Sequence, residues 1–237
     1  MFVPREGWVF VDADYSQIEL RVLAHIADDK RMQEAFTSGT DIHTATAAQV
    51  FGVAPEKVTP LMRRHAKAVN FGIVYGISAF SLSEDIGVSV PEAKAYIESY
   101  LRNYEGVREY MKRIVEQAKR DGYVTTLLGR RRELPELKSS NFNIRSFGER
   151  VALNTPIQGT AADIIKIAMI RVDNALRRKK LRARLILQVH DELIVECPLE
   201  EQQTVAELVK YEMEHVMQLH VPLLAEAKCG ASWYEAK

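Results

Sequence analysis

The chain has 237 residues, of which 47% are hydrophobic and 27% charged, so it is not disordered and suits one domain or two compact lobes. Its 32 basic and 32 acidic residues cancel, which argues against a simple basic arm for nucleic acid. No apolar run reaches the roughly 18 residues of a membrane span, and the first residues do not resemble a signal peptide. Cys197 and Cys229 form no CxxC pair, and we expect both to be buried thiols of a cytoplasmic protein.

Charge is spread unevenly along the chain. Residues 108–132 hold eight basic and three acidic side chains, and residues 166–184 hold eight basic and one acidic. Residues 185–237, by contrast, hold three basic and ten acidic side chains. This asymmetry favours one face for a polyanion, while ordinary solvated helix faces are an equally good interpretation of the charges alone.

The first predicted element is a buried strand at residues 8–14, an apolar run that ends in acid. Ser16 and Glu19 fit a capping box, which predicts a helix to about residue 27. Thr59 as the N-cap and Pro60 at the first helical position open another helix, which Gly76 ends. The other elements expected in this half are helices at 30–38, 42–51, 91–104 and 107–121 and a hairpin at 123–134 around Gly129.

The second half of the chain contains a predicted hairpin whose tip is charged. Apolar strands at 183–189 and 193–197 flank His190-Asp-Glu192. Pro156 is expected to break a helix that starts at residue 146. The remaining predictions are helices at 146–154, 160–179 and 200–217 and a strand at 223–229. The fold class is therefore α+β, with a small antiparallel sheet backed by helices and a mostly helical insertion.

Two aspartates stand beside apolar β runs, where a strand would favour Val or Ile. Asp14 ends the first strand, and Asp191 lies at the hairpin tip. Carboxylates brought together from distant strands can hold Mg²⁺, and paired Mg²⁺ ions support phosphoryl transfer. Either aspartate alone is more readily explained as a turn residue, but the pair with its flanking motifs favours a metal site.

Cations and aromatic residues recur every four positions on one predicted helix, at Arg63, Lys67, Phe71 and Tyr75. Each step of four residues rises about 6 Å, so the four form a stripe about 18 Å long. The stripe matches a nucleoside triphosphate whose phosphates meet the cations and whose base and sugar meet the rings. By spacing alone, an amphipathic helix with two snorkelling cations and two core aromatics is the commoner arrangement.

Three long segments occur in an order and at separations that belong to one enzyme family. They are Asp14-Tyr-Ser-Gln-Ile-Glu-Leu-Arg21, Arg63-Arg-His-Ala-Lys-Ala-Val-Asn-Phe-Gly-Ile-Val-Tyr75 and Gln188-Val-His-Asp-Glu192. They resemble motifs A, B and C of family A DNA polymerases of the bacterial polymerase I type. The shorter segments that begin at Asp41 and Thr155 also look like family segments. The resemblance covers essentially the whole chain.

The resemblance implies a role for each matching residue. Asp14 and Asp191, helped by the carbonyl of Tyr15, would hold two Mg²⁺ ions, with Glu192 as an accessory acid near the primer end. The nucleotide would be bound by Arg63 and Lys67 at its triphosphate, His43 near the phosphates, Phe71 at the sugar and base, Tyr75 at the template-base position and Glu19 at the 2′ position. Lys67 is also the candidate proton donor to pyrophosphate. Arg150, Asn154, Gln158 and His190 look like contacts to template and primer, and each is otherwise an ordinary helix or turn residue.

The resemblance also divides the chain into parts of a polymerase. It implies palm at 1–28, fingers at 29–135 with the motif B helix at 60–75, and palm again at 136–237 with the motif C hairpin at 183–197. In this family a thumb and the first palm strands precede motif A. Thirteen residues precede Asp14 here, so we expect the thumb to be absent from this chain.

The expected function is therefore the fingers–palm part of a template-directed DNA polymerase. Its substrates would be dNTPs and primer–template DNA, and its cofactor two Mg²⁺ ions. One alternative is a truncated, inactive remnant that still binds DNA or nucleotide. A second is one half of a split polymerase that needs a separate chain bearing the thumb and upper palm. A metal-dependent nuclease is a third, but a nuclease does not need a stripe suited to a triphosphate.

Overall fold

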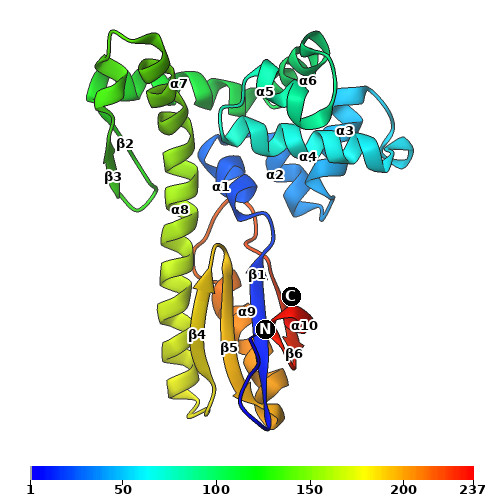
Figure 1. Ribbon diagram of the computed structural model, residues 1–237, viewed down its shortest axis with the longest axis vertical. Helices are drawn as coiled ribbons and strands as arrows, with labels where there is room; N and C mark the ends of the chain where they lie inside the picture. Colours follow the sequence, from blue (N-terminus) through cyan, green and yellow to red (C-terminus); the bar gives the residue numbers. More distant parts are fainter. Residues whose placement is uncertain (1) are drawn as a thin grey trace. The chain divides into compact units, whose positions relative to one another are not determined.

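Residues 2–237 are described by a computed structural model, and they form helices and antiparallel strands in two units (Figure 1). The sheet unit contains the residues up to Ile18 together with Ala161–Lys237, and the helical unit contains Glu19–Thr160. The predicted mixture of helices and antiparallel strands is confirmed. Among the described residues, no helix is long and apolar enough to cross a membrane.

The sheet unit is built on four strands in the order β4-β5-β1-β6, and every neighbouring pair is antiparallel. The strands are β1 (Trp8–Tyr15), β4 (Arg184–Val189), β5 (Glu192–Pro198) and β6 (Ala225–Gly230). The predicted charged hairpin is confirmed, because β4 and β5 pair with only His190 and Asp191 between them.

The two faces of β1 have different environments, because successive side chains of a strand point to opposite sides. The face of Val11 and Tyr15 is buried, and the Tyr15 hydroxyl donates to the Met213 carbonyl in α9 (Gln202–Glu214) at 2.7 Å. On the other face, Phe10 packs with Ile194 and with α10 (Trp233–Ala236). This second face also carries Asp12 and Asp14, and α10 leaves Asp14 exposed.

The helical unit follows the predicted order with one addition, α5 (Ala79–Ile86). Thr59 caps α4 as expected, since its side chain accepts from Met62 N, and Gly76 after the helix has a left-handed φ of 66°. Helix α5 was not predicted, although Ser78 caps its start and Gly87 ends it. The other elements are α1 (Ile18–Ile26), α2 (Lys30–Thr37), α3 (Ile42–Phe51), α4 (Pro60–Val74), α6 (Val90–Asn103), α7 (Glu105–Asp121), β2 (Tyr123–Thr125) and β3 (Arg131–Glu133).

One buried carboxylate joins two helix starts in this unit. Asp29 is 3% exposed, and its Oδ1 accepts from Met32 N of α2 at 3.0 Å while its Oδ2 accepts from Val107 N of α7 at 3.3 Å. Gly106 allows the close approach, because a Cβ there would lie 2.8 Å from both the Ala27 carbonyl oxygen and the Asp29 Cα. The negative charge therefore satisfies amide donors at two positive helix ends at once.

The predicted break at Pro156 is wrong, because α8 (Phe142–Arg178) runs through this residue as one helix of 37 residues. A proline inside a helix removes one backbone hydrogen bond and crowds the preceding turn. Here Pro156 is buried, and neighbouring elements hold the helix on both sides of it. The Tyr110 hydroxyl donates to the Leu153 carbonyl at 3.3 Å, and Leu127 N donates to Thr160 Oγ1 at 3.0 Å.

The two cysteines differ in burial, which corrects the expectation that both are buried. Cys197 lies on β5 inside the sheet and is buried. Cys229 is exposed because β6 is an edge strand of that sheet.

The substitution Asp29→Asn should destabilise the protein by about 2 kcal/mol, because it removes the charge and one of the two acceptor oxygens from a buried double cap. Chemical denaturation of the two proteins measures the difference. Asp85→Asn, at an exposed position of α5, is the matched control and should change the free energy of unfolding by less than about 0.5 kcal/mol. Equal effects of the two substitutions would contradict the double-cap role of Asp29.

Candidate active site

The residues singled out from the sequence fall into two sets, one within each unit. The sheet unit holds Asp14, Tyr15, His190, Asp191 and Glu192. The helical unit holds Glu19, His43, Arg63, Lys67, Phe71, Tyr75, Arg150, Asn154 and Gln158.

Strand pairing collects the acids of the sheet unit. Asp14 lies directly opposite Glu192 of β5 on one side and Glu226 of β6 on the other. The backbone N–H of Tyr15 donates to the Asp191 carbonyl at 3.2 Å, which ties the hairpin tip to the end of β1. His190 in that tip has a φ of 50°, a left-handed conformation that a non-glycine residue adopts only when its surroundings fix it. Two segments that are distant in the sequence therefore meet at one end of the sheet.

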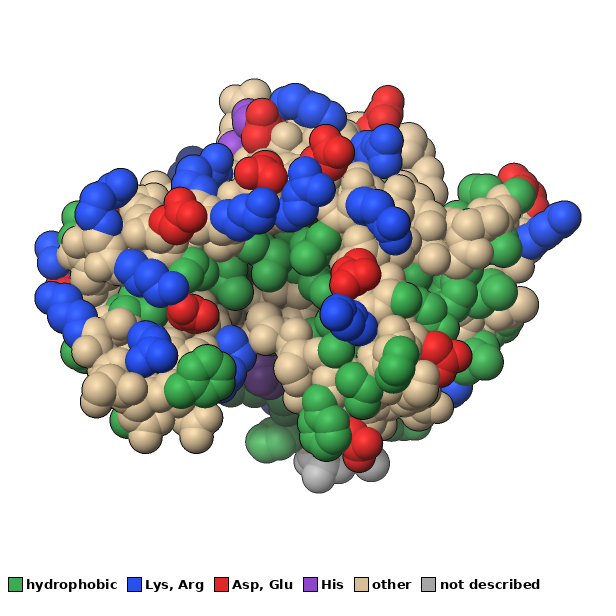
Figure 2. Space-filling view, turned by 90° about the horizontal axis from the view of Figure 1, so that it is seen from above, with side chains coloured by type: hydrophobic (Ala, Val, Ile, Leu, Met, Phe, Trp, Pro, Cys, Tyr) green, Lys and Arg blue, Asp and Glu red, His purple; other side chains and the backbone are tan. Residues whose placement is uncertain are grey.

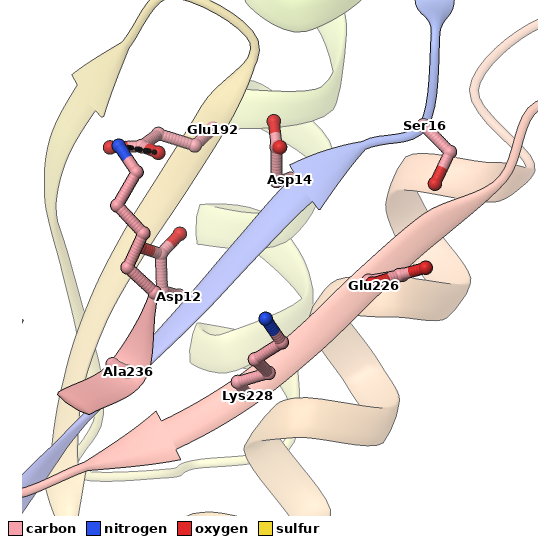
Figure 3. Close-up of a pocket in the computed structure, with 8 residues that line it drawn as sticks. Asp12, Asp14, Ser16, Glu192, Glu226, Lys228 and Ala236 are labelled. Carbon is pink, nitrogen blue, oxygen red and sulfur yellow. Dashed lines mark ion pairs between the residues drawn. The ribbon is translucent and has the colours of Figure 1, made fainter. Parts of the chain in front are cut away.

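A pocket of about 210 Å³ opens above these strands, and Figure 3 shows Asp12, Asp14 and Glu192 around it. Asp12 is 4% exposed and Glu192 is 5% exposed. One oxygen of each has a cationic or N–H partner, since Trp233 Nε1 donates to Asp12 Oδ2 and Lys237 Nζ pairs with Glu192 Oε2, both at 3.2 Å. The other oxygen of each is buried without a hydrogen-bond partner among the described residues.

Desolvation and neighbouring acids raise the pKa of two aspartates in this cluster. Although Asp14 is exposed, partial desolvation of its carboxylate by the surrounding pocket, followed by the charges of Asp191, Glu192 and Asp12, raises its pKa to about 6. Burial, followed by the charge of Glu192, raises the pKa of Asp12 to about 6, while Lys237 acts in the opposite direction on both aspartates. A cluster of this kind is stabilised by a proton or by a cation.

The donors in this cluster suit a hard cation such as Mg²⁺, because carboxylate and carbonyl oxygens are its preferred ligands. Within residues 2–237, no three His, Cys, Asp or Glu side chains form a complete ligand set. Magnesium in phosphoryl-transfer enzymes is usually held by one or two carboxylates together with substrate phosphates and water. Two aspartates and the Tyr15 carbonyl therefore fit a site that the substrate completes.

Sequence reasoning missed Asp12 and Lys237 in this cluster. Asp12 had a signal, because a residue two positions before Asp14 on a strand must lie on the same face. Lys237 had none, since only the fold brings α10 back to β1 and β5.

In the helical unit, the expected stripe lies along the accessible side of α4. Arg63, Lys67 and Tyr75 are exposed, and Phe71 is partly buried. The Lys67 Nζ lies 6.0 Å from the centre of the Phe71 ring, and the His43 ring centre lies 5.9 Å from that of Phe71. The opposite side of α4 packs into the unit through residues that are all buried, among them His65, Ala66, Val69, Asn70 and Ile73.

Arg63 already has an anionic partner. Its Nε donates to Asp41 Oδ2 at 2.7 Å and its Nη2 to Asp41 Oδ1 at 3.1 Å, a two-point contact. Asp41 also caps α3 by accepting from Thr44 N. Burial raises the pKa of Asp41, but the hydrogen bonds from Arg63 and Thr44 outweigh it and hold that pKa well below its ordinary value. The guanidinium is thus oriented, and a bound phosphate would compete with Asp41 for it.

Tyr75 joins the end of α4 to α1, since its hydroxyl donates to Glu19 Oε2 at 3.0 Å. Tyr75, Phe71 and Arg150 line a pocket of about 550 Å³. Gly76 is required there for two reasons. Its φ is left-handed, and a Cβ at this position would lie 3.1 Å from Arg150 Cγ.

The predicted DNA contacts of this unit share one side of α8, where Arg150, Asn154 and Gln158 recur every four residues. Arg150 and Gln158 are exposed, and the Asn154 Oδ1 is buried without a hydrogen-bond partner among the described residues.

Basic side chains do not form one uniform surface on the face seen from above. Figure 2, seen from above, shows Lys and Arg interspersed with Asp and Glu and with apolar side chains. Several of the cations are paired, as in Lys119–Glu149 and Arg131–Glu133. Solvated helix faces therefore account for part of the charge asymmetry along the chain.

Comparisons with known proteins agree on one family. The model of DNA polymerase family A matches residues 1–235. The chain is 59% identical over 237 residues to DNA polymerase I of Bacillus subtilis and 56% identical to that of Bacillus caldotenax, covering all of this chain and 27% of each relative. Among solved structures, it resembles the POL domain of Pol1 from M. smegmatis in complex with DNA primer-template and dNTP. The TM-score of that match is 0.94 and the identity 47%, over 99% of this chain and 41% of that one.

The raised pKa values predict how stability depends on pH in the absence of divalent cations. Between about pH 4 and 6 the folded chain keeps protons on Asp12 and Asp14 that the unfolded chain has released, so their contribution to stability falls as the pH rises through this window. The variant Asp14→Asn should therefore gain stability relative to the parent between about pH 4.5 and 7. Denaturant unfolding at both pH values measures this gain. Asp173→Asn is the control, and a gain as large in that variant would contradict repulsion within the cluster.

Proposed function

Because this chain belongs to DNA polymerase family A, we propose that it carries the site for template-directed DNA synthesis. In this reaction a primer 3′-hydroxyl attacks the α-phosphate of a dNTP, and pyrophosphate leaves. The observation that carries the proposal is the meeting of Asp14, Asp191 and Glu192, from two distant segments, at one end of a sheet. A further support is the M. smegmatis Pol1 domain, whose structure contains DNA primer-template and dNTP and which this chain resembles over 99% of its length.

We propose a palm role for the sheet unit and a fingers role for the helical unit. The antiparallel sheet carries the acids, and α4 carries the cations and aromatics, as motifs A, B and C of the family imply. Along the sequence, the boundaries between the two units fall after residue 18 and after residue 160. The motifs instead imply fingers at residues 29–135.

The acids of the sheet unit would bind two Mg²⁺ ions through Asp14, Asp191 and the carbonyl of Tyr15. Such ions neutralise phosphate charge and lower the barrier to displacement at phosphorus. The protein's own contribution is to hold two carboxylates close together despite their repulsion, through the β1–β5 pairing. Glu192 would act as an accessory acid, oriented by Lys237.

The helical unit would bind the incoming dNTP along α4. Arg63 and Lys67 would contact the triphosphate with His43, and Phe71 would pack on the sugar and base. Lys67 is the proposed proton donor to pyrophosphate, as the family resemblance implies, and its side chain is exposed on α4.

Template and primer would contact a second group of residues. These are Tyr75 at the template-base position, with Arg150, Asn154 and Gln158 along α8 and His190 at the hairpin tip. The side chains of Arg150, Gln158, Tyr75 and His190 are exposed, which leaves them accessible to DNA.

A direct assay separates this function from its rivals. Primed template, dNTP and Mg²⁺ should yield pyrophosphate and an extended primer. Release of dNMP from the DNA end would indicate a nuclease instead. Saturable dNTP binding with neither product would indicate either a remnant that binds nucleotide without turnover or one half of a split polymerase, and restored extension on adding a chain that bears the thumb and upper palm would identify the latter.

The substitutions Asp14→Asn and Asp191→Asn should each lower nucleotidyl transfer by at least about a thousandfold while leaving the fold intact, because each removes a metal ligand and its charge but no core packing. Single-turnover primer extension measures the loss, and circular dichroism checks the fold. The control Asp173→Asn should keep near-parental rates. Near-parental turnover of either test variant with Mg²⁺ would show that the two-metal assignment is wrong.

The substitution Glu19→Ala should weaken the preference for deoxyribonucleotides by roughly tenfold or more, because the proposed barrier to a 2′-hydroxyl is this side chain. Tyr75→Phe should weaken it less, since it keeps Glu19 but removes the hydroxyl that holds Oε2. Competition between dATP and ATP opposite template thymine gives the ratio for each variant. An unchanged ratio in Glu19→Ala would place the sugar elsewhere.

A further inference from the structure

A line of four buried polar groups runs through the core of the helical unit and ends at His43. Thr46 Oγ1 lies 3.1 Å from the Tyr104 hydroxyl and 3.1 Å from Asn70 Oδ1, and Asn70 Nδ2 lies 3.0 Å from His43 Nδ1. Tyr104, Thr46 and Asn70 have no exposed surface, and His43 is 3% exposed. The groups come from α3, α4 and the start of α7, so three helices fix their geometry.

The direction of these hydrogen bonds decides where His43 carries its proton. Burial raises the pKa of Tyr104 to about 12, so its hydroxyl remains a donor. If Tyr104 donates to Thr46 and Thr46 donates to the Asn70 oxygen, the Asn70 amide N–H points to His43 Nδ1. The reverse direction would place a proton on Nδ1 and leave the Tyr104 hydroxyl proton without an acceptor in the line. An unpaired donor in a fully buried position is unfavourable, so the first direction is preferred.

We propose that Asn70 is a positioning residue that fixes His43 as a neutral imidazole with its proton on Nε2. The ring then offers a phosphate oxygen one directed N–H donor and no positive charge. The assignment of phosphate as the ligand rests on the proposed function, whereas the assignment of the tautomer rests on the contacts of Asn70 alone.

The electrostatic surroundings of His43 agree with a neutral ring. Burial, with a smaller contribution from Arg63 and Lys67 on α4, lowers the pKa of His43 to about 4. Asp41, at the N-cap of α3, acts in the opposite direction, and its charge is engaged by Arg63. Arg63 and Lys67 already supply cationic groups for an anion, so His43 adds direction to the recognition and not a third charge.

The experiment is ¹⁵N NMR of the full chain labelled at histidine, which distinguishes the Nδ1–H and Nε2–H tautomers from the charged ring. We expect His43 to show the Nε2–H tautomer at pH 7 and no titration between pH 5.5 and 8. A proton on Nδ1, or a charged ring at pH 7, would overturn the proposal. This measurement on the parent protein does not depend on polymerase activity or on any variant folding.

The variant Asn70→Asp provides a second test, because a carboxylate can only accept and so favours a proton on Nδ1. The His43 ring should then become charged at pH 7 and titrate above its ordinary value. Asn143→Asp at the exposed start of α8 is the matched control and should leave the His43 signals unchanged. Unchanged His43 signals in a folded Asn70→Asp protein would contradict the positioning role.

The ligand is tested separately with inorganic triphosphate and then with a dNTP. Either anion should shift the His43 Nε2 signal more than the Nδ1 signal. In primer extension, Asn70→Asp should make the KM for dNTP depend on pH between 6 and 8 at least threefold more strongly than in the parent, with a smaller change in kcat. An Nε2 signal that neither anion moves would overturn the phosphate contact while leaving the tautomer established. A chain that binds triphosphate at Nε2 but extends no primer would instead count against the proposed function.

Discussion

The antiparallel pairing of β1 with β5 is the constraint on which the proposed chemistry depends. Its register places Asp14 opposite Glu192, and the adjoining bond from Tyr15 N to the Asp191 carbonyl holds the hairpin tip beside the end of β1. A shift of one residue would turn every side chain of β1 to the other face and bury Asp14 against α9. The buried residues Val11 and Ala13, which face away from the acids, oppose such a shift. Core packing on one side of the strand therefore stabilises the geometry of the candidate site on the other.

The same arrangement is electrostatically unfavourable without a cation, and the fold limits the cost locally. Trp233 and Lys237, contributed by the last helix and the residue after it, each engage one acid, and one buried oxygen of Asp12 and one of Glu192 have no hydrogen-bond partner within residues 2–237. In the helical unit the positive charge of Arg63 is likewise oriented in advance, because Asp41 accepts a hydrogen bond from its guanidinium. The sheet unit thus carries negative charge that a metal ion can neutralise, and the helical unit carries positive charge that a phosphate can neutralise. In both units these groups are oriented before a ligand binds.

Local signals predicted most elements where the chain carries its own caps and turns, although α5 was missed despite its caps at Ser78 and Gly87. Thr59, Pro60 and Gly76 delimit α4, and two apolar runs on either side of the charged tip at His190 and Asp191 identify the hairpin. Tertiary contacts decided the other exceptions. Helix α8 continues through Pro156 because Tyr110 and Leu127 support its neighbouring turns, and Cys229 is exposed because its strand is at the edge of the sheet. No local pattern contains this information.

The residues of the candidate site also differ in whether the sequence alone could identify them. Residues inside long motifs could be assigned by resemblance, whereas their partners could not, since Asp41, Asn70 and Lys237 act through contacts made by the fold. Asn70 shows the difference most clearly. In the sequence it lies within motif B, three residues after Lys67, but its side chain points to the core and meets His43 on another helix. A helix of this length presents two faces, and α4 uses the exposed one for cations and rings and the buried one to orient a histidine. In the proposed function, both faces of α4 therefore contribute to nucleotide recognition, one by direct contact and the other through His43.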